Sequence, residues 1–466
     1  MNDTIEINFQ EQFKALQARS LVLRRSTVKE RKQKLRRLEQ WILKHRDEIQ
    51  HAVYHDLRKP PQETDITEIY VVLGEIRLAR KMLSSWASKR FVNASLPFWG
   101  STSYVYHEPK GACLIISPWN YPFQLGIAPL ISAIAAGNSV MVKPSEFTAN
   151  TATLIKKMCE EVFDHDEIQV VLGGVEESTA LLKLPFDHIF FTGSPQVGKI
   201  VMTAAAKNLT SVTLELGGKS PTIVDPTASI KDAAEKISWG KWQNSGQVCI
   251  APDYLFVHED VKDELIGQLY KQSQKIYGKK ENYASIVSER HYDRIHELIA
   301  DAIQDGGKIA FGGTFDKEDL TFHPTLVSDI SEKARIANEE IFGPLLVLYS
   351  YKLLEEVIDY INQRPKPLAL YLFTRSQKNI HRIQQQTSAG MMAINEAVLQ
   401  FANPHLPIGG VNNSGIGKSH GHAGFLAFTN EKAVLDQRRG FTVAKTVYPP
   451  YSKFKNFMID LLVKYF

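Results

Sequence analysis

Short apolar runs alternate with helix-length stretches between residues 111 and 217. The runs are rich in Val, Ile, Leu, Met and Phe, as is typical of strands buried on both faces of a parallel sheet. They cover residues 112–117, 139–143, 168–172, 188–191 and 212–216. The stretches between them, such as 122–136, 148–162 and 195–207, predict helices. This repeated βαβ pattern predicts an α/β fold with a doubly wound parallel sheet.

A second α/β region is expected after Pro221. Its pattern predicts helices at 230–242, 261–277 and 290–302, and strands at 254–257 and 370–374. The N-terminal part is predicted to be helical, because Thr27 and Glu30 have the spacing of a capping box at a helix start. A further helical stretch is expected at 64–90. The basic run from Lys29 to Arg37 indicates either a surface for anionic ligands or a solvated helix face.

Two smaller elements complete the pattern. Residues 101–108 alternate around Tyr104 and Tyr106, which predicts an exposed strand or hairpin arm. Stretches 433–435 and 442–447 are read as late strands that can pair with it. The last residues place Phe454, Phe457, Met458, Leu461 and Leu462 at helical spacing. This amphipathic helix is too short to cross a bilayer, and it indicates either docking on its own subunit or a partner subunit, or weak contact with a membrane surface.

Composition excludes several classes of protein. The 466 residues carry a net charge of only +4, which argues against a nucleic-acid binder. The three cysteines are far apart and no zinc-type spacing occurs, so no metal site is expected; His420 and His422 are interpreted as part of a surface turn. The N-terminus lacks the form of a signal peptide. These observations predict a reducing compartment and a cytoplasmic protein.

Polar residues gather where the predicted strands end, which is where parallel sheets bind ligands. The strand ends carry Asn120, Lys143 with Glu146, the pair Gly173-Gly174, the segment Thr192-Gly193-Ser194, and Glu215. The turn from Gly193 to Gly198 opens a helix whose N–H groups can bind a phosphate. Lys143 and Glu146 suit either a ribose diol or a simple ion pair.

Cys249 is the candidate nucleophile. It ends a bend of sequence Gln243-Asn-Ser-Gly-Gln-Val-Cys249, where turning backbone can expose the sulfur. Asn120 can form an oxyanion hole together with the Cys249 N–H. Burial of Glu215 between Leu214 and Leu216 would raise its pKa toward that of a general base. The alternatives are a buried inert thiol and a salt-bridged carboxylate; Cys113 and Cys159 suit the inert interpretation.

The chain resembles the aldehyde dehydrogenase superfamily. The resemblance rests on Pro118-Trp-Asn-Tyr-Pro122, Lys143-Pro-Ser-Glu146, Phe191-Thr-Gly-Ser194, Glu215-Leu-Gly-Gly-Lys219, Gly246-Gln-Val-Cys249 and Glu339-Glu-Ile-Phe-Gly-Pro344. Residues 251–254, 413–417 and 420–421 resemble the class 3 and fatty aldehyde dehydrogenase branch. The resemblance implies a cofactor domain (1–90 and 109–217), a catalytic domain (218–415), a bridging β-arm (91–108 and 430–450), a C-terminal helix (451–466) and a homodimer.

The resemblance also implies roles for individual residues. Cys249 would attack an aldehyde, Asn120 would hold the oxyanion and Glu215 would activate water. Cofactor contacts are implied for Trp119, Lys143, Glu146, Gly193, Ser194, Gly198, Glu340 and Phe342. The roles of Trp119, Glu340 and Phe342 rest on the resemblance alone. NAD is expected because Glu146 would repel a 2′-phosphate, although the branch often accepts NADP as well.

The chain departs from the branch where substrate fit is expected to be decided. Glu396, Ile408 and Asn412 replace residues that are usual there. The C-terminal helix resembles the gate helix that covers the substrate tunnel of fatty aldehyde dehydrogenases. The expected substrate is a medium- or long-chain aliphatic or aromatic aldehyde. Two alternatives stay open: a cysteine acyl hydrolase, and a binding protein on a borrowed scaffold.

Overall fold

The first α/β unit is built on a six-stranded sheet. The computed structural model describes residues 2–93, 95 and 98–465. The sheet has the order β17-β7-β6-β3-β4-β5, and all pairs are parallel except that of β17 with β7. Its strands are β3 (Ala112–Ile116), β4 (Ser139–Lys143), β5 (Ile168–Val170), β6 (His188–Gly193), β7 (Ser211–Leu216) and β17 (Gly415–Ile416). The predicted doubly wound parallel sheet is confirmed.

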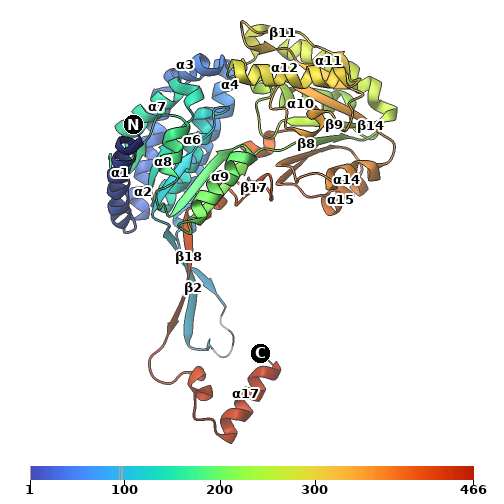
Figure 1. Cartoon of the computed structure of the whole chain (residues 1–466). Helices are drawn as coiled ribbons and strands as arrows, with labels where there is room; N and C mark the ends of the chain where they lie inside the picture. Colours follow the sequence, from blue (N-terminus) through green and yellow to red (C-terminus); the bar gives the residue numbers. More distant parts are fainter. Residues whose placement is uncertain (1, 94, 96–97, 466) are drawn as a thin grey trace.

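Helices cover both faces of this sheet (Figure 1). One face packs on α2 (Val28–Lys44), α3 (Arg46–Leu57), α5 (Tyr70–Trp86), α6 (Pro122–Ala136) and α7 (Ala149–Val162). The other packs on α1 (Asn2–Leu23), α8 (Val175–Leu181) and α9 (Pro195–Ala206). Strand residues alternate between the two cores, since Cys113 and Ile115 face one and Leu114 and Ile116 face the other. This double burial explains why the strands are apolar without a break.

The second α/β unit contains a seven-stranded sheet of order β10-β13-β14-β9-β8-β15-β16. Its strands are β8 (Ser220–Val224), β9 (Pro252–His258), β10 (Lys308–Phe311), β13 (Thr325–Ser328), β14 (Leu345–Tyr351), β15 (Ala369–Phe373) and β16 (Met391–Ile394). Its principal helices are α10 (Ile230–Trp242), α11 (Lys262–Tyr277), α12 (Glu289–Gln304), α14 (Leu354–Asn362) and α15 (Gln377–Gln386). All strand pairs are parallel except β10 with β13, so the predicted second α/β region is confirmed.

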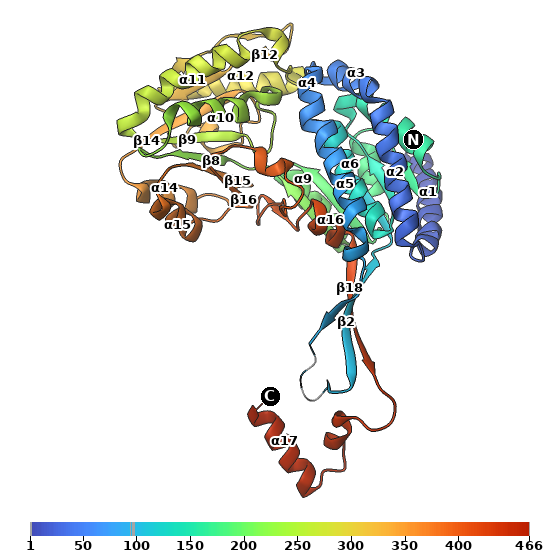
Figure 2. The same cartoon turned by 180° about the vertical axis from the view of Figure 1, so that it is seen from behind.

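A three-stranded arm projects from the first unit (Figures 1 and 2). It consists of β1 (Arg90–Val92), β2 (Ser101–Pro109) and β18 (Thr429–Gln437), with β2 in the centre. The register pairs Tyr104 with Val434, as the alternation of residues 101–108 and 433–435 predicts. Residues 94, 96 and 97 of the expected arm lie outside the described residues.

The strand expected at 442–447 is wrong. This segment forms the 3-10 helix η8 (Val443–Val447). Both edges of the central strand β2 are already taken by β1 and β18, so a further strand could not pair with it. The chain leaves the sheet after Gln437 and passes Gly440 at a φ of +87°.

The amphipathic C-terminal helix is present as α17 (Lys453–Tyr465). Both views place it at the far end of the arm, away from the two α/β units (Figure 2). It packs against η8, and its apolar side chains stay open: Phe454 is 66% exposed and Phe457 is 62% exposed. Docking of this helix on the body of its own chain is therefore not observed.

Candidate active site

Cys249 follows a strongly constrained bend. The 3-10 turn η4 (Gln243–Gly246) places Asn244 and Ser245 in the left-handed region, with φ of +48° and +52°. The Gln247 side chain holds the bend by donating to the carbonyls of Asn244 and Ser285, at 3.0 Å each, and by accepting the N–H of Val287 at 3.0 Å. The predicted bend is confirmed, and its strain is balanced by these hydrogen bonds.

The three thiols differ in access. Cys113 and Cys159 are buried in β3 and α7, whereas Cys249 is partly accessible and lines three adjoining hollows. Burial, together with the nearby carboxylates Glu340 and Glu215, raises the pKa of Cys249 to about 12. The resting thiol is therefore neutral, and it needs a proton acceptor before it can attack.

Asn120 lies beside the cysteine bend. It follows β3 and precedes α6, and it is 3% exposed. Its Nδ2 donates to the carbonyl of Gln247 at 2.9 Å. A side-chain amide carries two N–H groups, so the second is available to an oxyanion formed at Cys249. The structure brings Asn120 and Cys249 to one hollow although they are far apart in sequence.

Glu215 is the third candidate catalytic residue, after Cys249 and Asn120. It lies in β7 opposite Gly415 of β17, and it accepts a hydrogen bond from Ser419 Oγ at 2.8 Å. Burial raises its pKa to about 7, while Ser419, His420 and Lys418 counteract this shift. The carboxylate is shared by two of the hollows that reach Cys249. A carboxylate that titrates near neutral pH has the property of a general base.

The surface turn expected at His420 is wrong. His420 is 6% exposed, and its Nδ1 lies 3.1 Å from Glu75 Oε1. It precedes α16 (Gly421–Ala427), which packs against α5 and α6, so its imidazole faces Glu75 on α5 instead of solvent. The sequence offered one signal for this contact, because Glu75 interrupts the apolar face of α5 formed by Val72, Ile76 and Ala79.

A polar groove of about 240 Å³ leads to Cys249 from the ends of the first sheet. It is lined by Pro118, Trp119, Asn120, Leu125, Thr192, Gly193, Ser194, Glu215, Leu216, Gly217, Cys249, His291, Arg294, Glu340 and Phe342. Five of the eight residues expected to contact a cofactor line this groove: Trp119, Gly193, Ser194, Glu340 and Phe342. Lys143 and Glu146 do not line it, and they bond each other at the end of β4.

Several features of the groove suit a dinucleotide. A Cβ on Gly193 would lie 2.6 Å from the Phe191 ring, so only glycine leaves the backbone open there. Ser194 caps α9 by accepting the N–H of Val197 at 3.3 Å, and the N-terminus of this helix favours an anion. Lys143 Nζ lies 3.0 Å from Glu146 Oε2, so these two side chains form an ion pair in this structure.

Gly198 has a different setting from the other expected cofactor residues. It is buried in α9, and a Cβ there would lie 2.7 Å from Leu216 Cδ2. The structure therefore gives Gly198 a packing function: it lets α9 approach β7 closely. It does not line the groove.

The second α/β unit closes the groove with residues that sequence reasoning missed. His291 and Arg294 come from α12, and the His291 ring contacts both Trp119 and Phe147, at centroid distances of 4.9 and 5.4 Å. Burial raises the pKa of Glu340 to about 8. The sequence predicted the helix at 290–302, but no local pattern marked His291 and Arg294 as groove residues, since their contribution depends on how the two units meet.

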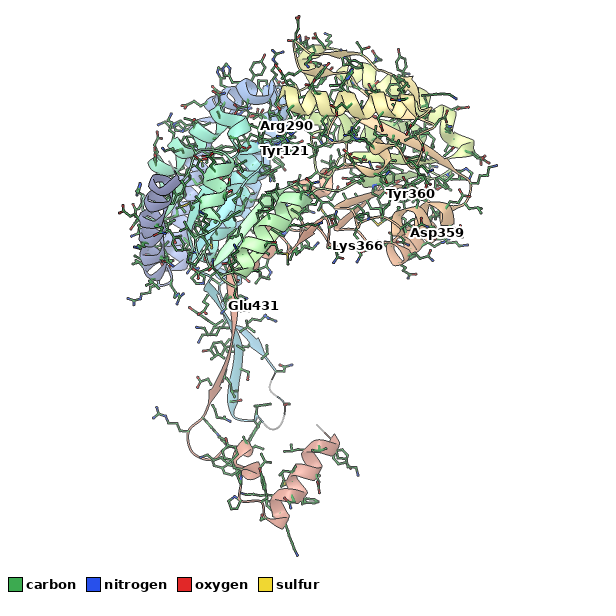
Figure 3. All side chains as sticks on the ribbon, viewed as in Figure 1. Tyr121, Arg290, Asp359, Tyr360, Lys366 and Glu431 are labelled. Atoms are coloured by element: carbon green, nitrogen blue, oxygen red, sulfur yellow. The ribbon has the colours of Figure 1, made fainter. Side chains whose placement is uncertain are left out.

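An apolar pocket of about 130 Å³ reaches Cys249 from another direction. It is lined by Ile66, Thr67, Tyr70, Val71, Tyr121, Gln124, Leu125, Trp239, Gln243, Val248, Cys249, Ile250, Val398, Leu399, Phe401 and Ala402. Tyr121 lies where the two units meet (Figure 3). Trp239 lines the pocket, whereas Trp242 is fully buried and donates to the Pro344 carbonyl at 3.0 Å.

The residues expected to decide substrate fit divide into two groups. Ile408 is 2% exposed and lines the inner hollow behind Cys249 and Glu215. Glu396 and Asn412 line none of the three hollows around Cys249.

In the described part of the chain, no helix is both long and apolar enough to cross a membrane. The described His, Cys, Asp and Glu side chains form no group suited to a metal ion.

The fold and the strand-end site are those of a cofactor-dependent α/β enzyme, and comparison with known proteins gives the family. Residues 7–434 match the aldehyde dehydrogenase family. The solved structure titled "Substrate bound state of Staphylococcus Aureus AldH" has a TM-score of 0.93 and 42% identity, and the match covers 97% of this chain and 99% of that one. The chain belongs to the aldehyde dehydrogenase family, whose members oxidise aldehydes to acids with NAD or NADP.

Curated relatives place the chain near class 3. The 4,4'-diaponeurosporen-aldehyde dehydrogenase of Staphylococcus aureus is 45% identical over 91% of this chain and 93% of that protein. Aldehyde dehydrogenase family 3 member A2 of Rattus norvegicus is 41% identical over 91% and 88%. A Mus musculus relative named "Aldehyde dehydrogenase, dimeric NADP-preferring" is 40% identical over 90% and 93%.

Proposed function

We propose that this enzyme oxidises medium- or long-chain aliphatic or aromatic aldehydes through a covalent intermediate on Cys249, with NAD as the preferred cofactor. The observation that supports this proposal best is the position of one sulfur between a polar groove and an apolar pocket. An apolar aldehyde in the pocket and a cofactor in the groove would meet at that sulfur. In this proposal, residues 1–90 and 109–217 form the cofactor domain and 218–415 the catalytic domain.

The first step is attack of the Cys249 sulfur on the aldehyde carbon. The thiol proton passes to Glu215, and a hemithioacetal forms whose oxyanion accepts hydrogen bonds from the free N–H of Asn120 Nδ2 and from the Cys249 N–H. The buried surroundings strengthen these bonds, because the local dielectric constant is low. The apolar pocket holds the rest of the substrate away from water.

The second half of the reaction releases the acid. Loss of a hydride from the hemithioacetal carbon leaves a thioester on Cys249; the bound cofactor supplies the hydride acceptor. Glu215, having returned the first proton to solvent, removes a proton from water, and the hydroxide attacks the thioester carbon. The carboxylic acid leaves, and Glu215 gives the proton taken from water to the departing sulfur, which restores the thiol. A pKa of about 7 lets one carboxylate serve both proton transfers.

The groove residues would bind and orient the cofactor. Ser194 and the start of α9 suit its phosphates, Lys143 and Glu146 suit a ribose, and Trp119, Glu340 and Phe342 surround the end of the groove at Cys249. Gly198 would act indirectly, by setting the distance between α9 and β7. The carboxylate of Glu146 favours NAD over a cofactor with a 2′-phosphate.

We also propose a homodimer in which α17 packs on the partner subunit. The apolar face of α17 is open, and the arm holds it away from its own chain. Packing on the partner next to the apolar pocket would make it a gate for long substrates. Weak contact with a membrane surface is the alternative. The three free cysteines agree with the proposed cytoplasmic location.

The function is tested by measuring NADH and NADPH formation with aldehydes of two to sixteen carbons. We expect kcat/KM to rise with chain length, to favour NAD, and to lose its chain-length dependence when residues after Pro450 are removed. Hydrolysis of a p-nitrophenyl ester without any aldehyde oxidation would support the acyl hydrolase instead. Light scattering on the full chain and the truncated chain tests the dimer.

A further inference from the structure

A buried group of charged side chains lies behind the active site and takes no part in the chemistry described above. Lys59 lies between α3 and α4 (Pro61–Thr64), and Glu68 lies in the π-helical turn η1 (Asp65–Ile69) that leads into α5. Both side chains are 0% exposed, and Lys59 Nζ lies 2.6 Å from Glu68 Oε1. Burying two charges costs several kcal/mol per ion, and apolar residues of similar size would often give equal stability. The pair therefore calls for a reason other than stability.

Both partners of the pair bond the segment that carries Asn120. Lys59 Nζ donates to the Asn120 carbonyl at 3.1 Å. Glu68 Oε2 accepts the N–H groups of Phe123 and Gln124, at 2.8 and 3.2 Å. These N–H groups belong to the first turn of α6, where they have no partner within the helix. The pair thus fixes the chain on both sides of Tyr121, whose ring lies 4.0 Å from Lys59 Nζ.

Glu63 and Asn244 connect the same segment to the cysteine bend. The Asn244 N–H donates to Glu63 Oε1 at 2.7 Å, although Asn244 is in the left-handed region. Asn244 Nδ2 donates to the Asn120 carbonyl at 2.8 Å and to the Gln247 carbonyl at 3.2 Å. Asn120 Nδ2 returns a bond to the Gln247 carbonyl at 2.9 Å. The hydrogen bonds form a closed network between the amide of Asn120 and the bend before Cys249.

We propose that Lys59, Glu63 and Glu68 are positioning residues that hold the Asn120 amide and the Cys249 bend in one fixed geometry, so that both oxyanion donors point at the same atom. This inference rests on the proposed function of Asn120 and Cys249. A π-helical turn at Glu68 agrees with it, because such turns are frequent at functional sites. Two donors that converge on one oxygen lose their effect when either moves by about 1 Å.

The test is a double-mutant cycle on the full-length enzyme. Lys59→Met with Glu68→Gln removes both charges together and leaves neither buried alone. We expect kcat to fall about 100-fold, as for a misplaced oxyanion donor, with KM for the aldehyde and Kd for the cofactor within about 3-fold of wild type. In an Asn120→Ala background the same pair of substitutions should change kcat by less than about 5-fold, because the group it positions is already gone.

The matched control is Lys34→Met with Glu167→Gln, a second lysine–glutamate pair with side chains 16% and 2% exposed on the same unit. It should leave kcat within about 3-fold of wild type at a similar change in Tm. Equal losses in the wild-type and Asn120→Ala backgrounds would mean that the Lys59 pair acts only on stability, and would overturn the proposal. If Asn120→Ala keeps the kcat of the wild type, Asn120 is not an oxyanion donor. That result would overturn both the proposed function of Asn120 and the proposal that Lys59, Glu63 and Glu68 position it.

A second pair of variants covers the case in which the double substitution does not fold. Glu63→Gln keeps a side-chain oxygen that can accept the Asn244 N–H, whereas Glu63→Leu removes it. We expect Glu63→Gln to retain kcat within about 3-fold and Glu63→Leu to lose about 30-fold, with cofactor Kd unchanged in both. Equal kcat values for the two variants would contradict the positioning of the bend by Glu63.

Discussion

The polar groove and the apolar pocket meet at Cys249, yet they are built in opposite ways. The groove is formed by strand ends, a helix N-terminus and carboxylates, and a glycine at 193 keeps its backbone open. The pocket is formed by side chains of helices and loops, and among them aromatic and aliphatic groups predominate. Strand ends and a helix N-terminus present backbone groups that stay fixed when side chains change, whereas a pocket lined by side chains can change its size by substitution. The reaction should therefore depend on the groove, and the choice of aldehyde on the pocket.

The largest expected effect comes from the sulfur that joins the two regions. Cys249→Ala should lower NADH formation by at least about 10³-fold, because no covalent intermediate can form. Cofactor affinity, measured by fluorescence titration, should stay within about 3-fold. Cys159→Ala is the matched control, since its buried thiol in α7 lines none of the three hollows. An active Cys249→Ala enzyme would contradict the mechanism.

The next effect concerns the carboxylate at the junction. Glu215→Gln should lower kcat about 100-fold or more, because nothing removes the proton from water. Its wild-type pKa of about 7 predicts that activity rises as the pH passes 7 and Glu215 ionises. Rapid mixing should show no burst of NADH, since the Cys249 thiol also loses its proton acceptor. If the Glu215→Gln variant keeps the rise in activity as the pH passes 7, a group other than Glu215 acts as the base.

A charge in the pocket should separate binding from chemistry. Val71→Asp places a carboxylate on a wall that is now 7% exposed. Because a buried CH₂ contributes about 0.8 kcal/mol, we expect kcat/KM for a ten-carbon aldehyde to fall at least about 10-fold and that for acetaldehyde to change little. Steady-state kinetics with both aldehydes provide the measurement. Equal losses for the two substrates would place the substrate elsewhere.

A substitution of Glu146 should change the preference for the cofactor without changing the preference for the aldehyde. Glu146→Gln removes the charge that opposes a 2′-phosphate and frees Lys143 from its ion pair. The ratio of kcat/KM for NADP to that for NAD should rise about 10-fold, while the chain-length dependence stays as in wild type. An unchanged ratio would show that Glu146 does not face the ribose.

The smallest effect is on stability. Burial raises the pKa of Glu340 from 4.5 to about 8, so its ionisation in the folded protein is unfavourable. The stability that this carboxyl contributes is full below pH 4.5 and is lost as the pH rises through 8. Glu340→Gln should therefore raise Tm by a few degrees at pH 9 and by less at pH 5, measured by calorimetry. A larger gain at pH 5 would contradict this sign.

The fold was largely predictable because each buried strand of the first sheet is apolar on both faces, a pattern that is local in sequence. The strand expected at 442–447 failed for a non-local reason, because both edges of β2 are already paired. The candidate site likewise contains some residues that local patterns could predict and others that they could not. Asn120, Glu215 and Cys249 could be found from strand ends and a bend, whereas His291, His420 and the Lys59–Glu68 pair depend on contacts between distant elements.

The sequence by itself determined the two α/β units, the arm, the amphipathic tail and the choice of Cys249 as candidate nucleophile, because apolar periodicity, turn residues and motif order are properties of neighbouring positions. Only the tertiary structure decided that Glu215 has a pKa of about 7, that Gly198 serves packing, and that α17 stands away from its own chain. A pKa, a close approach and an open face each depend on which distant groups surround a residue, and folding alone brings those groups together.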